Sequence, residues 1–168
     1  MNLLINLKKR KIDYLNRHNL LFLIIVIVTF SLDRISKFKI INNFNENTYF
    51  INDFINFDLI WNIGIGFGLL STNSNLVYNI ISTIIGLVII LLIYLSIFGD
   101  KKEKLIYSII IGGASGNFYD RIIYKAVPDF IDIHYKNIHW FTFNLADVFI
   151  TFGVVFFIIK SFNENKNE

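Results

Sequence analysis

Five aspartates of this chain stand within or beside long apolar runs, where a charged side chain is costly. The five are Asp33, Asp120, Asp129, Asp132 and Asp147. Two carboxylates that converge from separate elements can share one proton, because like charges a few ångström apart cannot both stay ionised. One then acts as a base on water while the other donates a proton to a carbonyl oxygen. The residue types therefore indicate aspartic-protease chemistry, but their spacing does not say which two aspartates form the pair.

Other classes of membrane protein also fit buried carboxylates. A small proton-coupled carrier or channel subunit places acidic groups near the middle of the bilayer, and a purely structural protein uses such charges to brace helices.

Ser115 also suggests an intramembrane serine protease, which needs a base beside the serine. This possibility is disfavoured, because the candidate bases His134 and His139 lie outside the predicted spans. The absence of Cys excludes disulfides, thiolate metal sites and cysteine nucleophiles.

The composition predicts one integral membrane domain covering residues 1–168. Hydrophobic residues make up 54% of the chain and the mean hydropathy is +0.53, which is too high for an ordinary soluble domain. We expect a membrane all-α fold, a bundle of four transmembrane helices with a small external β-sheet. The predicted spans cover residues 20–41, 76–98, 105–121 and 141–160, and the external segments cover residues 42–75 and 122–140. A signal peptide over the first apolar run is disfavoured, because no small-residue cleavage site follows it.

The distribution of Lys and Arg predicts the orientation of the chain. Basic residues gather in residues 1–18, in residues 99–104 and at Lys160, whereas residues 42–75 contain none. Cytoplasmic loops collect Lys and Arg, so both termini and the loop between the second and third spans are expected in the cytoplasm. The net charge of +3 is modest and the basic clusters lie between apolar runs, so no nucleic-acid partner is expected.

This orientation places three carboxylates at one depth. Counted from the cytoplasmic ends at 1.5 Å per residue, Asp33 and Asp147 lie roughly 20 Å into their spans and Asp120 roughly 22 Å. In a hydrocarbon core about 30 Å thick, that level is in the outer half of the membrane. Ionisable residues inside a membrane face the bundle interior, so the shared level predicts one shared site near the external surface.

The segment between the first two spans contains a predicted strand. Residues 57–68, FDLIWNIGIGFG, alternate large apolar side chains with a second face that carries the glycines. A period of two with aromatic residues is typical of a strand, and glycines permit close backbone approach. Residues 129–135 are also compatible with an extended form and are expected to pair with this strand. A partly disordered loop is the alternative, because no second run alternates as strongly.

Two further patterns predict helix contacts. Asp33 and Lys37 are four residues apart on one helix and can form an internal ion pair that neutralises both charges. Gly112, Gly113 and Gly116 form a surface of small residues that lets another helix approach closely.

The polar residues that border the external segments have structural interpretations as well. Asp120 and Arg121 can form a bidentate pair at the end of the third span, where Asn117 can bond to the backbone. Asn144, followed three residues later by Asp147, is typical of a helix start. Pro128 favours an extended backbone that aims Asp129.

These residues fall in five blocks that resemble the lipoprotein signal peptidases, also called signal peptidase II, a family of bacterial intramembrane aspartic proteases. The blocks are DRISK at 33–37, NIGIGFG at 62–68, GGASGNFYDR at 112–121, VPDF at 127–130 and FNLAD at 143–147. Their order and their positions between four apolar spans make the resemblance specific.

The resemblance implies a function and a set of roles. The family removes the signal peptide from prolipoproteins, cutting just before a cysteine that carries a diacylglyceryl group. It implies that Asp129 and Asp147 are the catalytic pair. The residues implied to line or brace the site are Asp33, Lys37, Asn62, Gly64, Asn117, Asp120, Arg121 and Asn144. No metal or organic cofactor is expected, and the expected partners are lipidated prolipoproteins and membrane lipid. A monomer in the bacterial inner membrane is expected.

One residue departs from the family pattern. Pro128 stands where the family more often has a second Val before the catalytic aspartate, and proline preserves the extended geometry.

We also expect the substrate peptide to lie along the face that carries Gly64 and Gly66, where missing side chains allow backbone contact.

Overall fold

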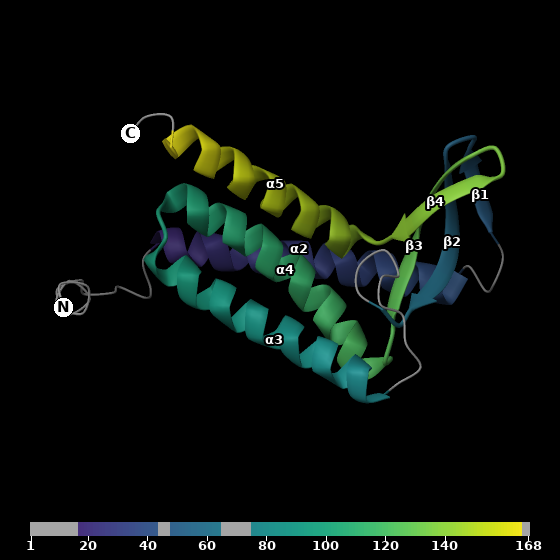
Figure 1. The fold of residues 1–168 in the computed structure, drawn as a ribbon, viewed down its shortest axis with the longest axis horizontal. Coiled ribbons are helices and arrows are strands. Elements are labelled where there is room, and N and C mark those ends of the chain that lie inside the picture. Colours follow the sequence, from purple (N-terminus) through teal and green to yellow (C-terminus); the bar gives the residue numbers. More distant parts are fainter. Residues whose placement is uncertain (1–16, 44–47, 65–74, 166–168) are drawn as a thin grey trace, which may run out of the picture.

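The computed structural model describes residues 17–43, 48–64 and 75–165. Within these ranges the chain forms four α-helices and one antiparallel sheet. The helices are α2 (Arg17–Asn43), α3 (Asn75–Phe98), α4 (Lys101–Ile123) and α5 (Leu145–Asn165). They run alongside one another, and the sheet lies at one end of the bundle (Figure 1).

Three of these helices are long and apolar enough to cross a membrane. The apolar spans are Asn19–Asn43 in α2, Asn75–Phe98 in α3 and Leu145–Asn163 in α5, with mean hydropathies of 1.9, 2.9 and 2.0. Many of their large apolar side chains are exposed, as expected of surfaces that face lipid. Helix α4 has a shorter apolar stretch than these three, because it carries charged residues near both ends. It is the central helix, in contact with α2, α3 and α5.

Each predicted span coincides with one helix, although α2 and α4 begin three and four residues before the starts predicted at residues 20 and 105. The prediction that residues 141–160 form one span is wrong at its beginning, because Ile138–Phe143 form strand β4 and α5 begins at Leu145. The segment IHWFTF is rich in aromatic and β-branched residues, which favour a half-buried strand. Its apolar character, taken alone, resembles the start of a membrane helix.

Glycines bring the backbone of α4 close to its neighbours, as the small-residue surface predicts. A Cβ atom at Gly112 would lie 1.7 Å from Thr29 Oγ1 of α2. A Cβ atom at Gly113 would lie 2.7 Å from the carbonyl oxygen of Ala146 in α5. One face of α4 therefore contacts α2 and another contacts α5 with no side chain of α4 at these two positions.

The end of the bundle away from the sheet is held by polar contacts. Asp100 caps α4, accepting a bond of 2.8 Å from the Glu103 N–H, while Glu103 Oε2 accepts one of 2.9 Å from the Asp100 N–H. Lys160 of α5 lies 3.0 Å from a carboxylate oxygen of each of these residues. This network fixes the end of α5 against the start of α4.

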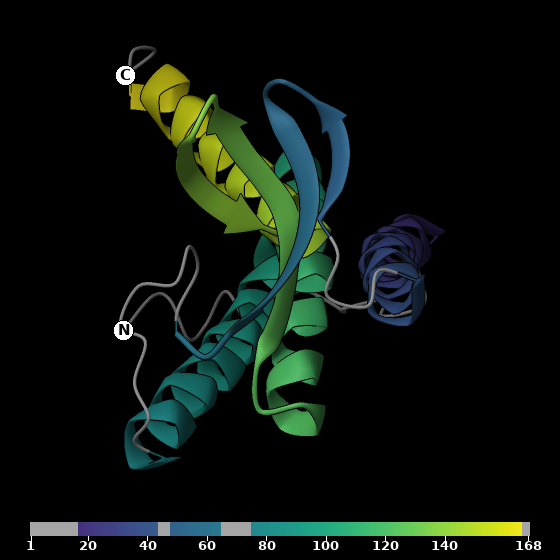
Figure 2. The ribbon, with the colours of Figure 1, turned by 90° about the vertical axis from the view of Figure 1, so that its right-hand side faces the viewer.

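The sheet contains four strands in sequence order. They are β1 (Tyr49–Asn52), β2 (Ile55–Asn62), β3 (Val127–Tyr135) and β4 (Ile138–Phe143). The predicted pairing of the two extended segments is confirmed, because β2 and β3 are antiparallel neighbours with Ile60 opposite Asp129. Figure 2 shows these two strands running side by side at the end of the helices. Gly66 and Gly68 of the predicted strand lie outside the described residues.

We expect Gly112→Ala to lower the free energy of unfolding by about 1–3 kcal/mol, because the added methyl group collides with Thr29 and with the backbone of Val26. Thermal unfolding in detergent measures the effect. Gly86→Ala in α3 is the matched control, since its Cβ atom would meet only the edge of the Phe118 ring, at 3.1 Å. An equal shift of the unfolding midpoint in both variants would contradict close packing at Gly112.

Candidate active site

One asparagine connects two aspartates that come from different elements. Asn144 lies between β4 and α5 and is fully buried. Its side-chain Nδ2 donates to Asp129 Oδ1 of β3 at 2.6 Å, and its Oδ1 accepts from the Asp147 N–H of α5 at 3.1 Å. Its own backbone N–H donates to Asp147 Oδ2 at 3.2 Å. Asn144 therefore holds both carboxylates, that of Asp129 through its side-chain amide and that of Asp147 through its backbone N–H.

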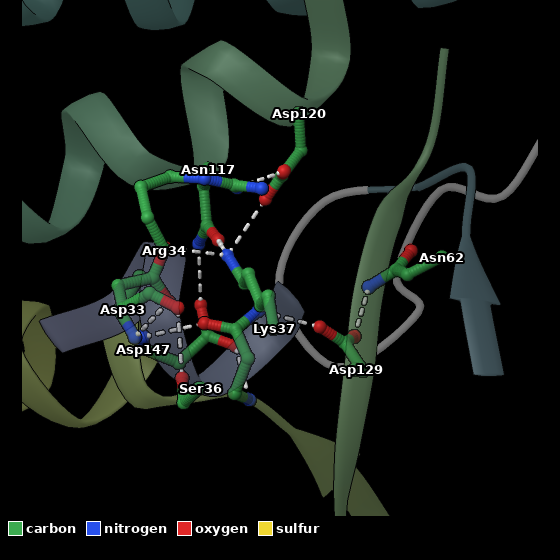
Figure 3. Close-up of polar contacts among 11 residues, drawn as sticks. Asp33, Arg34, Ser36, Lys37, Asn62, Asn117, Asp120, Asp129 and Asp147 are labelled. Carbon is green, nitrogen blue, oxygen red and sulfur yellow. Dashed lines mark hydrogen bonds and ion pairs between the residues drawn. The ribbon is translucent and has the colours of Figure 1, made fainter. Parts of the chain in front are cut away.

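Asp129 is buried near the start of β3, opposite Ile60 of β2, with 2% of its surface exposed. Asn62 Nδ2, at the end of β2, donates to its Oδ2 at 2.8 Å (Figure 3). Burial, and after it the negative charge of Asp147, raise the pKa of Asp129 from 3.8 to about 6. Both amide donors act in the opposite direction but are weaker. This carboxylate is therefore suited to hold a proton close to neutral pH.

Asp147 lies in the first turn of α5 and receives hydrogen bonds suited to an ionised carboxylate. Asn117 Nδ2 of α4 donates to its Oδ1 at 2.8 Å, in addition to the Asn144 N–H on Oδ2. The positive end of the helix dipole also stabilises a negative charge at this position. The helix-start motif predicted for Asn144 and Asp147 is confirmed, because each accepts a bond from the backbone N–H of the other.

A buried lysine organises the acceptors around the pair. Lys37 Nζ, with 0% of its side chain exposed, lies 2.9 Å from Asp33 Oδ2 and 2.7 Å from Asp120 Oδ2. It also donates to Asn117 Oδ1 at 2.7 Å (Figure 3). The predicted ion pair of Asp33 and Lys37 is confirmed. Asn117 bonds to side chains here, whereas the sequence suggested a backbone partner.

Asp33 also connects α2 to the start of α5. Its Oδ1 accepts a bond of 3.0 Å from the Ala146 N–H. This N–H lies in the first turn of α5, where the backbone donors have no acceptor within the helix. A Cβ atom at Gly116 of α4 would lie 2.3 Å from Asp33 Oδ2, so only glycine leaves room for this carboxylate. Two carboxylates at the predicted common depth, Asp33 and Asp120, thus meet through Lys37, and Asp147 joins them through Asn117.

Arg34 belongs to this network and was missed in the sequence. Its NH1 pairs with Asp120 Oδ1, and its guanidinium lies 4.6 Å from the centre of the Tyr119 ring. The available signal was its spacing, three residues before Lys37 and therefore on the same side of the helix.

The predicted pairing of Asp120 with Arg121 is wrong. Arg121 instead donates through NH2 to the carbonyl oxygen of Gly64, after β2, and lies over the Tyr78 ring at 5.6 Å. Adjacent residues of a helix point about 100° apart, so Asp120 points toward α2 while Arg121 points toward Gly64 at the end of β2. The Gly64 N–H in turn donates to Asn62 Oδ1 at 2.7 Å.

The remaining predicted candidates lie elsewhere. Asp132 forms its ion pairs with His134 and His139, which removes both histidines as bases for Ser115. Asp132 points to the other face of β3 from Asp129, because the two positions differ by three and successive side chains of a strand alternate between its faces.

Comparisons with known proteins agree with the architecture and give the family of the chain. The family model described as "Signal peptidase (SPase) II" matches residues 25–163. A lipoprotein signal peptidase of Pelagibacter ubique is 46% identical over 148 residues, covering 86% of this chain and 89% of that protein. A lipoprotein signal peptidase of Anaplasma phagocytophilum is 39% identical, covering 84% and 92%.

Two solved structures of bacterial membrane enzymes, determined by the in meso method, have similar folds. The first has a TM-score of 0.73 at 28% identity and covers 88% of this chain and 90% of that chain. The second has a TM-score of 0.65 at 28% identity and covers 83% and 90%. These relatives give no support to the alternative of a proton-coupled carrier. The family match over most of the chain, together with relatives above one-third identity, shows that the chain belongs to the signal peptidase II family.

Proposed function

We propose that Asp129 and Asp147 are the catalytic pair of this signal peptidase II, which removes signal peptides from prolipoproteins. The observation that supports the assignment is the bridge through Asn144, whose side chain donates to the Asp129 carboxylate of β3 and whose backbone N–H donates to the Asp147 carboxylate of α5. The pair shares one proton. Asp147 is assigned as the ionised base, because it accepts from Asn117 and from the Asn144 N–H at the positive end of the α5 dipole, and the proton is assigned to Asp129.

The reaction follows from these two states. Asp147 takes a proton from a water molecule as the water oxygen attacks the scissile carbonyl carbon, and Asp129 gives its proton to the carbonyl oxygen. The tetrahedral intermediate then collapses, the C–N bond breaks, and the proton on Asp147 goes to the leaving amine. The Asp129 carboxylate recovers a proton from the hydroxyl group of the intermediate as the new carboxyl carbonyl forms.

The substrate bond is the one just before a diacylglyceryl-modified cysteine. A lipidated cysteine holds its peptide bond close to the membrane surface. Strand β3, which carries Asp129 near its start, begins where the sheet meets the helices (Figure 1). Asn62 and Gly64 are proposed to border the peptide, because they end β2 beside Asp129. Six further residues brace the two catalytic residues, and these are Asp33, Lys37, Asn117, Asp120, Arg121 and Asn144.

We further propose that α4 crosses the membrane as the fourth span of one domain covering residues 1–168. The start of α4 and the end of α5 lie at the cytoplasmic side, and the sheet lies outside the inner membrane. The basic residues at 101–104 and Lys160 stand at the end of the bundle opposite the sheet, as the positive-inside tendency requires (Figure 1). Exposed aromatic side chains of the sheet, such as Phe50 and Trp140, suit a membrane interface. The enzyme acts as a monomer.

The function is tested with two synthetic peptides that share one signal sequence. One carries a diacylglyceryl group on the cysteine and the other carries none. We expect the purified enzyme to cleave only the lipidated peptide, just before the modified cysteine, as measured by mass spectrometry of the products. Equal cleavage of both peptides would contradict recognition of the lipid.

We expect Asp129→Asn and Asp147→Asn each to reduce cleavage by about a thousandfold or more, because each removes one member of a pair that acts as a unit. Asp53→Asn is the matched control, since Asp53 is exposed in the turn between β1 and β2 of the same sheet. Membrane insertion and the unfolding midpoint are measured for all three variants. Near-normal cleavage by either catalytic variant would remove that residue from the pair.

We expect kcat/KM to fall about tenfold per pH unit above an apparent pKa of about 6, because the pair must keep one proton and Asp129 loses it there. The value belongs to the interacting pair rather than to one residue. The corresponding fall in kcat is expected at higher pH, since bound substrate removes more water from Asp129 and raises its pKa further. Initial rates of lipopeptide cleavage over a pH series measure both profiles, and pH-independent rates would argue against a shared proton.

A further inference from the structure

Three metal-ligating side chains converge on the outer hairpin, on the face of β3 that the catalytic pair does not use. Asp132 and His134 are two residues apart on β3, and His139 of β4 pairs directly with His134 across the hairpin. Ligand atoms of the three residues all lie within 4.8 Å of one another. His139 Nδ1 lies 2.7 Å from Asp132 Oδ2, and His134 Nδ1 lies 3.6 Å from the same oxygen.

One ring nitrogen in this group has no hydrogen-bond partner. His134 is 5% exposed, and its Nδ1 is buried without a partner although it faces the carboxylate. A single proton can join Asp132 to His139 at 2.7 Å, but it leaves His134 Nδ1 unsatisfied, and a buried unsatisfied group is costly. A cation bound between the three side chains would satisfy both nitrogens and the carboxylate together.

The surroundings of Asp132 also favour a cation. Within the described part of the chain, its ion pairs are with the two histidines and not with Lys or Arg. Asn56 of β2 is the cross-strand neighbour of Asp132, and its amide Oδ1 is another buried acceptor without a partner. Four acceptor atoms therefore lie on one face of three adjacent strands.

We propose that Asp132, His134 and His139 bind a divalent transition-metal ion of the zinc type. Two imidazoles and one carboxylate form a ligand set that Zn²⁺ uses in proteins, with an open fourth position that water or Asn56 can fill. A tetrahedral ion with bonds of about 2.1 Å separates its ligands by about 3.4 Å. The His139 side chain is 59% exposed, so it can rotate to this spacing without movement of the strands. The bound ion would fasten β4 to β3, three residues beyond Asp129.

The test uses the full chain without a polyhistidine tag, purified in detergent and freed of metal with a chelator. Calorimetric titration with Zn²⁺ is expected to give one site per chain, and Co²⁺ at the same site is expected to give visible absorption bands. His139→Ala should weaken Zn²⁺ binding by at least about tenfold to a hundredfold. His18→Ala is the matched control, because it removes the one other histidine of the chain, in α2, and should bind Zn²⁺ as the wild type does.

A second measurement keeps the proposal independent of folding defects. Zn²⁺ is expected to raise the thermal unfolding midpoint of the wild type and of His18→Ala but not of His139→Ala, because a ligand stabilises only the state that binds it. Each midpoint with Zn²⁺ is compared with that of the same variant without metal, so the loss of the bond between His139 and Asp132 does not affect the comparison. The proposal is overturned if the wild type binds no Zn²⁺, or if His139→Ala binds it as tightly as the wild type.

Discussion

The site depends on one buried ammonium group. Lys37 Nζ is the cation that joins Asp33 on its own helix to Asp120 and Asn117 on α4, and Asn117 continues the chain of contacts to Asp147 on α5. Removing one member of a buried group of charges leaves the others uncompensated. This lowers the free energy of unfolding more than replacing the whole group with well-packed apolar side chains does. Three helices are thereby held in one arrangement at the level where the sheet begins.

The protein uses two kinds of donor for two kinds of carboxylate. Asp33 and Asp120 are paired with cations, whereas Asp129 and Asp147 receive their hydrogen bonds from the amides of Asn62, Asn117 and Asn144 and from a backbone N–H. An amide orients a carboxylate without adding the full positive charge that would favour ionisation of both members. The cations stabilise the framework, and the amides leave a proton available to the proposed catalytic pair.

Much of this arrangement could be predicted from residue type and spacing. The apolar runs gave the helices, the alternation at 57–68 indicated β2, and counting along the spans brought Asp33, Asp120 and Asp147 to one level. The role of Arg34 and the partner of Arg121 could not be predicted, because they depend on the rotation of each helix about its axis. Strand β4 was missed because an aromatic strand and the start of a membrane helix have the same hydropathy. The choice of Asp129 among five aspartates required the family resemblance, because spacing along the chain does not show which side chains from separate elements converge.

The reciprocal bonds between Asn144 and Asp147 have a consequence for when the enzyme becomes active. These bonds begin helix α5, and the same Asn144 side chain also holds Asp129. Helix initiation and assembly of the two carboxylates are therefore one event, so a chain whose last helix has not docked lacks an aligned pair. A newly inserted protein would thus be unable to hydrolyse peptides in the membrane until α5, which leaves the ribosome after the other described helices, is in place.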